Sequence, residues 1–478
     1  MQRPNILILY TDQQRWDALG VNGNPDIKTP NLDALAAHGV NFDHFFVQSA
    51  VCMPSRISFL SGQYPSTLGT YDNGVPVPEH WITLPKLLRN YGYHSANIGK
   101  LHFLNHANRD HRDPHPDYGF DHLEISDEPG CYEDAYRAYV RRVAPDQLDH
   151  ISVGLPPAAE TWQQLMGIHD GIKHPEVRQP RGARASACRD DMTHTAFVAT
   201  QTIEYLRAAR DDFRGNFRGS FRGRPWMCIA GFYSPHSPWV APQKFLDLYD
   251  PAKLTLPQFP PDVDAKRKPG HFDDDELRSV IHGYYAMVSE VDHHVGRILD
   301  ALDQTGQADN TIVIFTSDHG EWLGEHLRYG KGYPGHDPIA RVPMIIRWPA
   351  AVTKPGRTET GLTEAVDVIP TLLEAAAIPV PAHLQGQSFL STLTDGPQPG
   401  RDSAVIEFES AKAMRTDRYL YVIHADGREF LYDVHDPLGS YHNLGSDPAR
   451  AADLAQLRRQ LLARTIAAEH QLPRQWAY

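Results

Sequence analysis

The sequence has few features of a secreted disulfide scaffold, a membrane protein or a nucleic-acid-binding protein. Four cysteines occur in 478 residues, at positions 52, 131, 188 and 228, and no two form a CxxC pair. Neither a disulfide framework nor a thiolate zinc site is therefore expected. No apolar run approaches the roughly 20 residues of a membrane span. The net charge of −13 disfavours nucleic acid or an anionic membrane as a partner.

Two further features bear on location and partners. The N-terminus, Met1-Gln2-Arg3-Pro4, lacks the hydrophobic region and cleavage site of a secretory signal. We therefore expect the chain to begin at Met1 and to act in the cytoplasm. Three Phe-Arg-Gly triplets within residues 213–223 are similar to an RGG-type nucleic-acid segment. They are too short in so acidic a chain, and we interpret them as a flexible surface insertion.

Continuous apolar runs predict strands that are buried on both faces, as in the centre of a parallel sheet. These runs are Asn5–Tyr10, Pro225–Phe232 and Thr311–Thr316, and further strands are predicted at Tyr93–Ile98 and Val342–Arg347. Segments with helical periodicity or with Pro and Gly at their ends predict helices. They are residues 30–38, 83–91, 192–210 and 273–305. The predicted fold class is α/β, with a large, mostly parallel central sheet flanked by helices.

The composition changes near residue 375. Residues 376–401 are rich in Pro, Gly and Gln and are predicted to form a linker. Alternating segments at 404–408 and 419–424 predict a small antiparallel sheet, and residues 451–469 a closing helix. We therefore predict an α/β domain over residues 1–385 and a smaller α+β subdomain over residues 386–478. Residues 103–190 show little periodicity and are predicted to be long loops with short helices that cover the strand ends.

The stretch around Cys52 carries the first sign of chemistry. Pro54 is typical of the first turn of a helix, so Cys52 is expected at or just before a helix N-terminus. The backbone N–H groups there attract anions, and Arg56 lies one turn further on. The ordinary interpretation of an isolated free cysteine is a buried core residue.

Polar residues follow four of the predicted strands. They are Asp12 and Gln13, Lys100 and His102, His236, and Asp318 and His319. The carboxyl ends of parallel strands meet at one edge of a sheet. We therefore expect these side chains to converge on one pocket with Cys52.

The two kinds of side chain in this pocket suit different tasks. Oxygen-rich ligands with one imidazole favour a hard divalent ion: Asp12, Gln13, Asp318 and His319. Cations and proton donors favour a tetrahedral oxyanion during sulfuryl or phosphoryl transfer: Arg56, Lys100, His102, His236 and Lys331. For each residue taken singly, a surface or hydrogen-bonded polar role is the ordinary alternative.

Together these motifs resemble the sulfatase family of the alkaline phosphatase superfamily. The similarity includes the C-x-P-S-R turn at 52–56, Gly-Lys-x-His at 99–102, Pro-His at 235–236, Ser-Asp-His-Gly at 317–320 and Lys331. The resemblance implies that a formylglycine-generating or sulfatase-maturating enzyme oxidises Cys52 to formylglycine. The formylglycine hydrate is then the nucleophile that attacks sulfur.

The resemblance also implies a role for each matching residue. The metal ligands would be Asp12, Gln13, Asp318 and His319, together with the modified Cys52. Arg56 would brace the formylglycine, and the sulfate would be held by Lys100, His236 and Lys331. His236 or Lys331 would protonate the leaving alcohol, and His102 would take the proton of the second hydroxyl. Asn73 resembles a substrate-contacting asparagine of phosphonate monoester hydrolases.

The sequence departs from the common sulfatase pattern at two metal positions. Gln13 and His319 stand where many sulfatases have Asp and Asn. This resembles the phosphonate monoester hydrolases and makes Mn²⁺ or Mg²⁺ candidates beside Ca²⁺. Lys100 and His102 are the sulfatase-type pair.

Three hypotheses therefore remain. The first is hydrolysis of a sugar, aryl or alkyl sulfate monoester. The second is hydrolysis of a phosphonate monoester or phosphodiester. The third is a metal- or anion-binding protein with an unmodified Cys52 and no turnover. The sequence also leaves open whether the chain forms a homo-oligomer.

Overall fold

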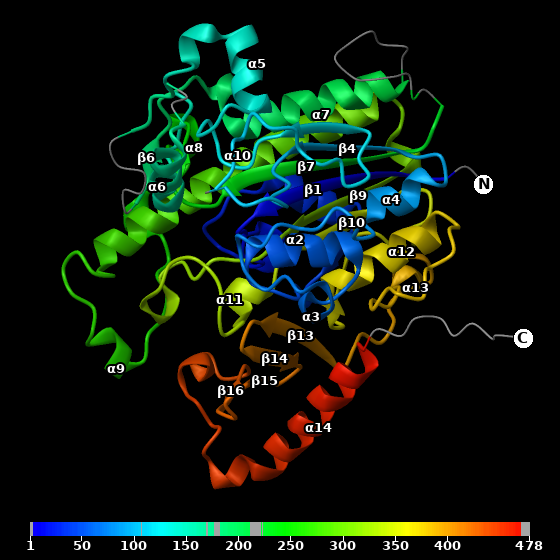
Figure 1. Ribbon diagram of the computed structural model, residues 1–478. Coiled ribbons are helices and arrows are strands. Elements are labelled where there is room, and N and C mark those ends of the chain that lie inside the picture. Colours follow the sequence, from blue (N-terminus) through cyan, green and yellow to red (C-terminus); the bar gives the residue numbers. More distant parts are fainter. Residues whose placement is uncertain are drawn as a thin grey trace, which may run out of the picture.

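The computed structural model describes residues 3–469, apart from 107, 169–170, 176–181, 211–220 and 222. Most of the Phe-Arg-Gly repeat lies outside these residues, so the predicted surface insertion stays a prediction. Helices cover both faces of one large sheet, and a second, smaller sheet with the long C-terminal helix lies beside this layered body (Figure 1).

The large sheet has eight strands in the order β11-β2-β10-β9-β1-β7-β4-β5. Their bounds are β1 Asn5–Asp12, β2 Val40–Phe42, β4 His94–Gly99, β5 His122–Ile125, β7 Trp226–Pro235, β9 Thr311–Ser317, β10 Met344–Arg347 and β11 Arg357–Glu359. The run β5-β4-β7-β1-β9 is parallel throughout, and β10 pairs antiparallel with β9 and β2. The prediction of a large, mostly parallel sheet is thus confirmed.

The sheet is covered by helices because successive residues of each strand point to opposite faces. Ile6 and Ile8 of β1 join a core with α2, α4 and α12. Leu7 and Leu9 join the opposite core with α1, α7 and α10. The bounds of these helices are α1 Pro30–Ala37, α2 Cys52–Ser61, α4 Leu84–Arg89, α7 His194–Arg210, α10 Asp274–Gln304 and α12 Val368–Ala375. Both faces of the central strands are therefore buried, as the apolar runs predict.

The C-terminal part forms its own antiparallel sheet in the order β13-β14-β15-β16. The bounds are β13 Ser403–Phe408, β14 Ala411–Thr416, β15 Tyr419–His424 and β16 Glu429–Asp433, followed by α14 Ala451–Ala467. Leucines of α14 pack on this sheet, which confirms the predicted antiparallel sheet and closing helix. The predicted linker at 376–401 contains a short helix, α13 Leu390–Thr394. The boundary between residues 385 and 386 stays a prediction.

Residues 103–190 contain more structure than the sequence predicts. They add β5, a fifth parallel strand at the edge of the sheet, whose residues are only half-buried and include His122 and Glu124. A strand without an apolar run gives no periodic signal, which is why this one was missed. The segment also holds α5 Ala135–Val143, α6 Pro157–Met166 and the short β6 Arg184–Ala185.

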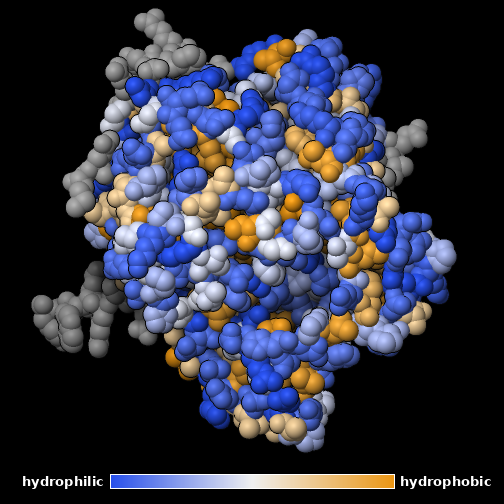
Figure 2. All heavy atoms as spheres, turned by 180° about the vertical axis from the view of Figure 1, so that it is seen from behind, coloured by the Kyte–Doolittle hydropathy of each residue, from blue (hydrophilic) through white to orange (hydrophobic). Residues whose placement is uncertain are grey.

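The remaining short elements are α3 Pro65–Leu68, α8 Gln243–Leu246, α9 Pro261–Asp264, α11 Asp337–Ala340, β3 Phe45–Phe46, β8 Val240–Ala241 and β12 Thr363–Glu364. Among the described residues, no helix is both long and apolar enough to cross a membrane. The face in Figure 2 is mostly hydrophilic, with apolar side chains in small, scattered patches.

Candidate active site

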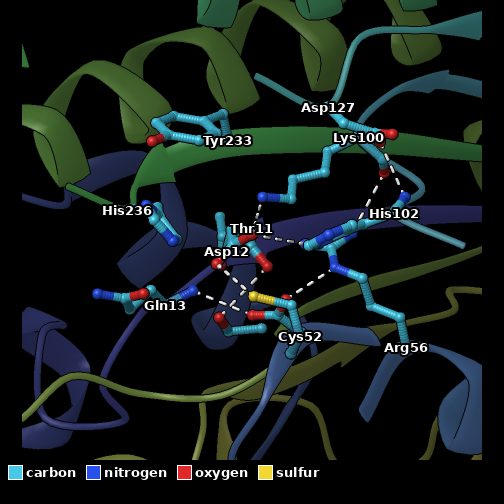
Figure 3. Close-up of polar contacts among 12 residues, drawn as sticks. Thr11, Asp12, Gln13, Cys52, Arg56, Lys100, His102, Asp127, Tyr233 and His236 are labelled. Carbon is cyan, nitrogen blue, oxygen red and sulfur yellow. Dashed lines mark hydrogen bonds and ion pairs between the residues drawn. The ribbon is translucent and has the colours of Figure 1, made fainter. Parts of the chain in front are cut away.

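The polar residues predicted at the strand ends do meet at one edge of the sheet. Asp12 ends β1, Lys100 follows β4, His236 follows β7, and Asp318 follows β9. Parallel pairing of β1 with β7 and β9, and of β4 with β7, aligns these ends. Figure 3 shows Asp12, Lys100 and Arg56 directed toward the space beside Cys52.

Cys52 is the first residue of α2 and is buried, as the position of Pro54 predicts. Its Sγ lies 3.2 Å from His319 Nε2, 3.8 Å from Asp12 Oδ1 and 2.6 Å from Lys331 Nζ. Burial and the nearby Asp12 raise the pKa of the Cys52 thiol to about 11. A thiol with this pKa is protonated at neutral pH, which does not suit a thiolate nucleophile.

An acidic cluster lies against Cys52. One ligand atom each of Asp12, Cys52, Asp318 and His319 lies within 4.8 Å of the others. His319 Nδ1 is 2.8 Å from the Gly320 carbonyl oxygen. An N–H at Nδ1 would donate to this oxygen and leave Nε2 free to bind a cation.

Gln13 is buried beside this cluster, and its backbone N–H donates to Asp318 Oδ1 at 3.0 Å. Within the described ranges, no donor reaches Gln13 Oε1. Two carboxylates, one imidazole and an unused amide oxygen form a donor set that fits a hard divalent cation.

Buried cations balance these acids. Arg56 Nε lies 2.7 Å from Asp318 Oδ2, and its Nη2 lies 3.5 Å from Asp12 Oδ2. Lys100 Nζ lies 2.7 Å from Asp12 Oδ2. Burial opposes ionisation of Asp12, but Lys100, His236, Lys331 and Arg56 outweigh it and hold the pKa of Asp12 well below its usual range.

His236 and Lys331 are only half-buried. Lys331 Nζ lies 3.2 Å from His236 Nε2, and His236 Nδ1 lies 2.6 Å from the carbonyl oxygen of Ser237. Burial and the adjacent Lys331 lower the pKa of His236, so its imidazole is neutral at neutral pH. These two side chains therefore offer hydrogen bonds at the accessible side of the site.

His102 and Asn73 are the remaining residues that the sequence predicts for the site. The N–H of His102 donates to Asp127 Oδ1 at 2.8 Å, and the His102 ring stacks on His106 with centroids 4.1 Å apart. Burial, followed by His106 and Lys100, lowers the pKa of His102 well below its ordinary value. Asn73 is exposed, and its Oδ1 accepts the N–H of Met53 at 3.0 Å. One N–H at the start of α2 is thus already used, contrary to the expectation that free N–H groups gather there.

Several residues of the site were not predicted from the sequence. The Tyr10 ring lies 4.8 Å from Arg56 Cζ, and the Tyr233 ring lies 4.9 Å from Lys100 Nζ. Both tyrosines belong to predicted strands or their ends, but an aromatic residue there is typical of a core. Asp127 and Glu321 contact other site residues directly, and only Glu321, next to the Ser-Asp-His-Gly motif, had a local signal.

The sheet edge thus places a buried cysteine at a helix start among paired carboxylates and cations in an α/β protein, with a donor set that fits a divalent cation. The chain belongs to the sulfatase family, which it matches over residues 4–378. Residues 324–467 also match the family described as N-sulphoglucosamine sulphohydrolase, C-terminal.

Individual relatives include sulfatases and a phosphonate monoester hydrolase. The chain is 29% identical to an ulvan-active sulfatase of Formosa agariphila, over 93% of this chain and 77% of the relative. It is 30% identical to a choline-sulfatase of Rhizobium meliloti, over 95% of this chain and 85% of the relative. The crystal structure of a phosphonate monoester hydrolase of Agrobacterium radiobacter superimposes with a TM-score of 0.80 and 26% identity, covering 98% and 97% of the two chains.

Proposed function

We propose that the chain hydrolyses sulfate monoesters after Cys52 has been converted to formylglycine by a maturating enzyme. The supporting observation is the position of Cys52, between the Lys331 ammonium group and the cluster of Asp12, Asp318 and His319, called the Asp12–His319 cluster below. A thiol with a raised pKa gains little from such surroundings. An oxygen nucleophile gains from both the hard-cation ligands and the neighbouring cations.

The proposed reaction has two steps, a displacement at sulfur and an elimination that releases sulfate. A hydroxyl of the formylglycine hydrate attacks sulfur, and the bond from sulfur to the alcohol oxygen breaks. Lys331 gives the leaving oxygen a proton, since the His236 imidazole is neutral, and Lys100 neutralises charge on the sulfuryl oxygens. His102 then takes the proton of the second hydroxyl, whose oxygen forms the double bond of the restored aldehyde. The bond between the same carbon and the oxygen that carries sulfur breaks, and this oxygen leaves as part of the sulfate.

A divalent ion would be held by Asp12, Gln13, Asp318 and His319, with Ca²⁺, Mn²⁺ and Mg²⁺ as candidates. When bound, such an ion stabilises negative charge on oxygen and lowers the pKa of a hydroxyl. Arg56 would keep the ligand carboxylates in place, since it contacts both Asp318 and Asp12.

A test of the chemistry at position 52 combines mass and rate. The peptide that contains residue 52 should be lighter than the cysteine form in active enzyme, because formylglycine replaces sulfur by oxygen. Cys52→Ala should lower kcat by more than about 10³-fold, as removal of a nucleophile does. Cys188→Ala, at a half-buried free cysteine, serves as the control and should retain activity. An active enzyme with an unmodified Cys52 would refute the mechanism.

A second candidate is hydrolysis of phosphonate monoesters or phosphodiesters. It is favoured by the Gln13 and His319 ligand positions and by the structural similarity to a phosphonate monoester hydrolase. The Lys100 and His102 pair supports sulfate esters. The two are separated by kcat/KM on an aryl sulfate and on a phenyl phosphonate monoester. A preference for the phosphonate above about 10³, or roughly 4 kcal/mol, would contradict the first candidate.

A further inference from the structure

Gln13 contributes a side chain with two chemically different ends to the proposed metal site. The oxygen and nitrogen ends of an amide have nearly the same shape, but only the oxygen can bind a cation. Gln13 Nε2 donates to Glu321 Oε2, and Gln13 Oε1 is left buried with no donor within the described ranges. We propose that Glu321 is a positioning residue that turns the oxygen of the Gln13 amide toward the metal. This rests on the proposed function in treating the Asp12–His319 cluster as a metal site.

Glu321 is itself fixed in its position. It is fully buried, and its Oε1 accepts the backbone N–H groups of Leu323, at 3.1 Å, and of Gly330. An ionised carboxylate can only accept hydrogen bonds. With Oε1 used by two donors, Oε2 faces Gln13 and requires a donor from it. Only the nitrogen end of the amide meets this requirement.

The backbone of Gln13 is held in place, so only the orientation of its side-chain amide can vary. Its φ of 68° lies in the left-handed region, which is rare for a residue other than glycine. Its N–H donates to Asp318 Oδ1 at 3.0 Å, and its carbonyl oxygen accepts the Tyr284 hydroxyl at 2.8 Å. Because both backbone groups are held, the contact with Glu321 decides which end of the amide is left available to a cation.

The pair also accounts for a neutral residue at position 13. A carboxylate there would face the Glu321 carboxylate, and like charges in contact disfavour ionisation of both. The choice of a neutral residue at position 13 therefore depends on the acid at position 321. Glu321 reaches the Lys331 segment as well, through the N–H of Gly330, so one side chain holds two parts of the site.

The test is metal affinity, measured without substrate by chelator competition with Ca²⁺ and with Mn²⁺. Glu321→Gln and Gln13→Glu should each weaken binding by about 10–100-fold, the usual effect of losing a partner of a metal ligand. In the double variant, the amide at 321 can donate to the carboxylate at 13 and still accept from Leu323 and Gly330. Its affinity should return to within about threefold of the wild type, since coupled neighbours are not additive.

Glu325→Gln is the matched control. Glu325 lies in the same segment but pairs with Arg15 at 2.7 Å, so its loss should leave metal affinity unchanged. Thermal unfolding of the metal-free variants checks that each has folded. Wild-type affinity in Glu321→Gln, or a double variant no better than the weaker single variant, would overturn the inference alone. A wild-type protein that binds neither ion would overturn the proposed metal site and this inference together.

Discussion

Lys100 and His102 reach the same site because the backbone between them is bent around one carboxylate. Asp127 Oδ1 accepts the N–H of Leu101 at 2.9 Å and that of His102 at 2.8 Å. His102 has a φ of 55°, in the left-handed region, and such a conformation persists only where its surroundings hold it. Figure 3 shows Asp127 beside this turn, away from Cys52. Asp127 is thus placed to orient two proposed catalytic groups through the backbone.

At the residue scale we therefore expect Asp127→Ala to lower kcat by about 100-fold, because a displacement near 1 Å of a catalytic group has this effect. Asp127→Asn keeps an acceptor oxygen and should retain most of the activity. Steady-state kinetics of both variants, with circular dichroism as the folding control, would check this. Equal losses in the two variants would mean that the charge of Asp127, rather than its hydrogen bonds, matters.

The end of β4 depends on close contact between two backbones. The N–H of Lys100 donates to the carbonyl oxygen of Gly231 at 2.8 Å. Gly99 has a φ of 90°, and a Cβ placed there would overlap the same carbonyl oxygen. Strand β7 can therefore lie this close to β4 only because residue 99 has no side chain.

At the element scale, Gly99→Ala should lower the free energy of unfolding and raise KM, because Lys100 follows directly. The matched control is Gly92→Ala, where φ is 85° but a Cβ would meet no atom within 4 Å. Gly92→Ala should lower the free energy of unfolding by about 1–2 kcal/mol, because alanine is disfavoured in the left-handed conformation. Gly99→Ala should cost about 1–3 kcal/mol more for overpacking. Urea unfolding of both variants measures the difference, and equal losses would argue against the close contact.

The same elements show what the sequence could predict. Strands β1, β7 and β9 are buried on both faces, so their apolar runs identify them. The polar residues at the ends of these strands and of β4 locate Asp12, Lys100, His236 and Asp318. The antiparallel direction of β10 leaves no trace in its apolar run. Asp127 contacts His102, 25 residues away in the sequence, and Glu321 contacts Gln13, 308 residues away. Such contacts form only when the chain folds, so the sequence pattern does not predict them.

A buried ionic network around Glu364 of β12 joins the C-terminal sheet to the rest of the molecule. This residue is fully buried and contacts Arg464 of α14 at 2.7 Å and Arg401 at 3.2 Å. Its Oε1 also accepts the N–H of Val405 in β13 at 2.7 Å. In Figure 1, β13 and the end of α14 lie against the layered α/β part of the molecule at this junction. The C-terminal subdomain is thus anchored by charge as well as by apolar packing.

This junction also reaches the active site. The N–H of Glu407 in β13 donates to the carbonyl oxygen of Gln48 at 2.7 Å, four residues before Cys52. The strand that Glu364 anchors therefore holds the segment that leads into α2. Loosening the subdomain should for this reason disturb the position of residue 52 as well as the junction.

At the scale of the whole molecule, Glu364→Ala should lower the free energy of unfolding by about 3–5 kcal/mol, because it removes the buried carboxylate that pairs with Arg464, while Arg401 keeps its contact with Asp367. Asp426→Ala removes an acid from an exposed pair with Arg428 and should cost less than about 1 kcal/mol. Urea unfolding followed by circular dichroism, together with residual activity, tests both. Activity and structure should be lost in one transition. A Glu364→Ala protein that keeps full activity after its C-terminal sheet has unfolded would show that the junction does not support the site.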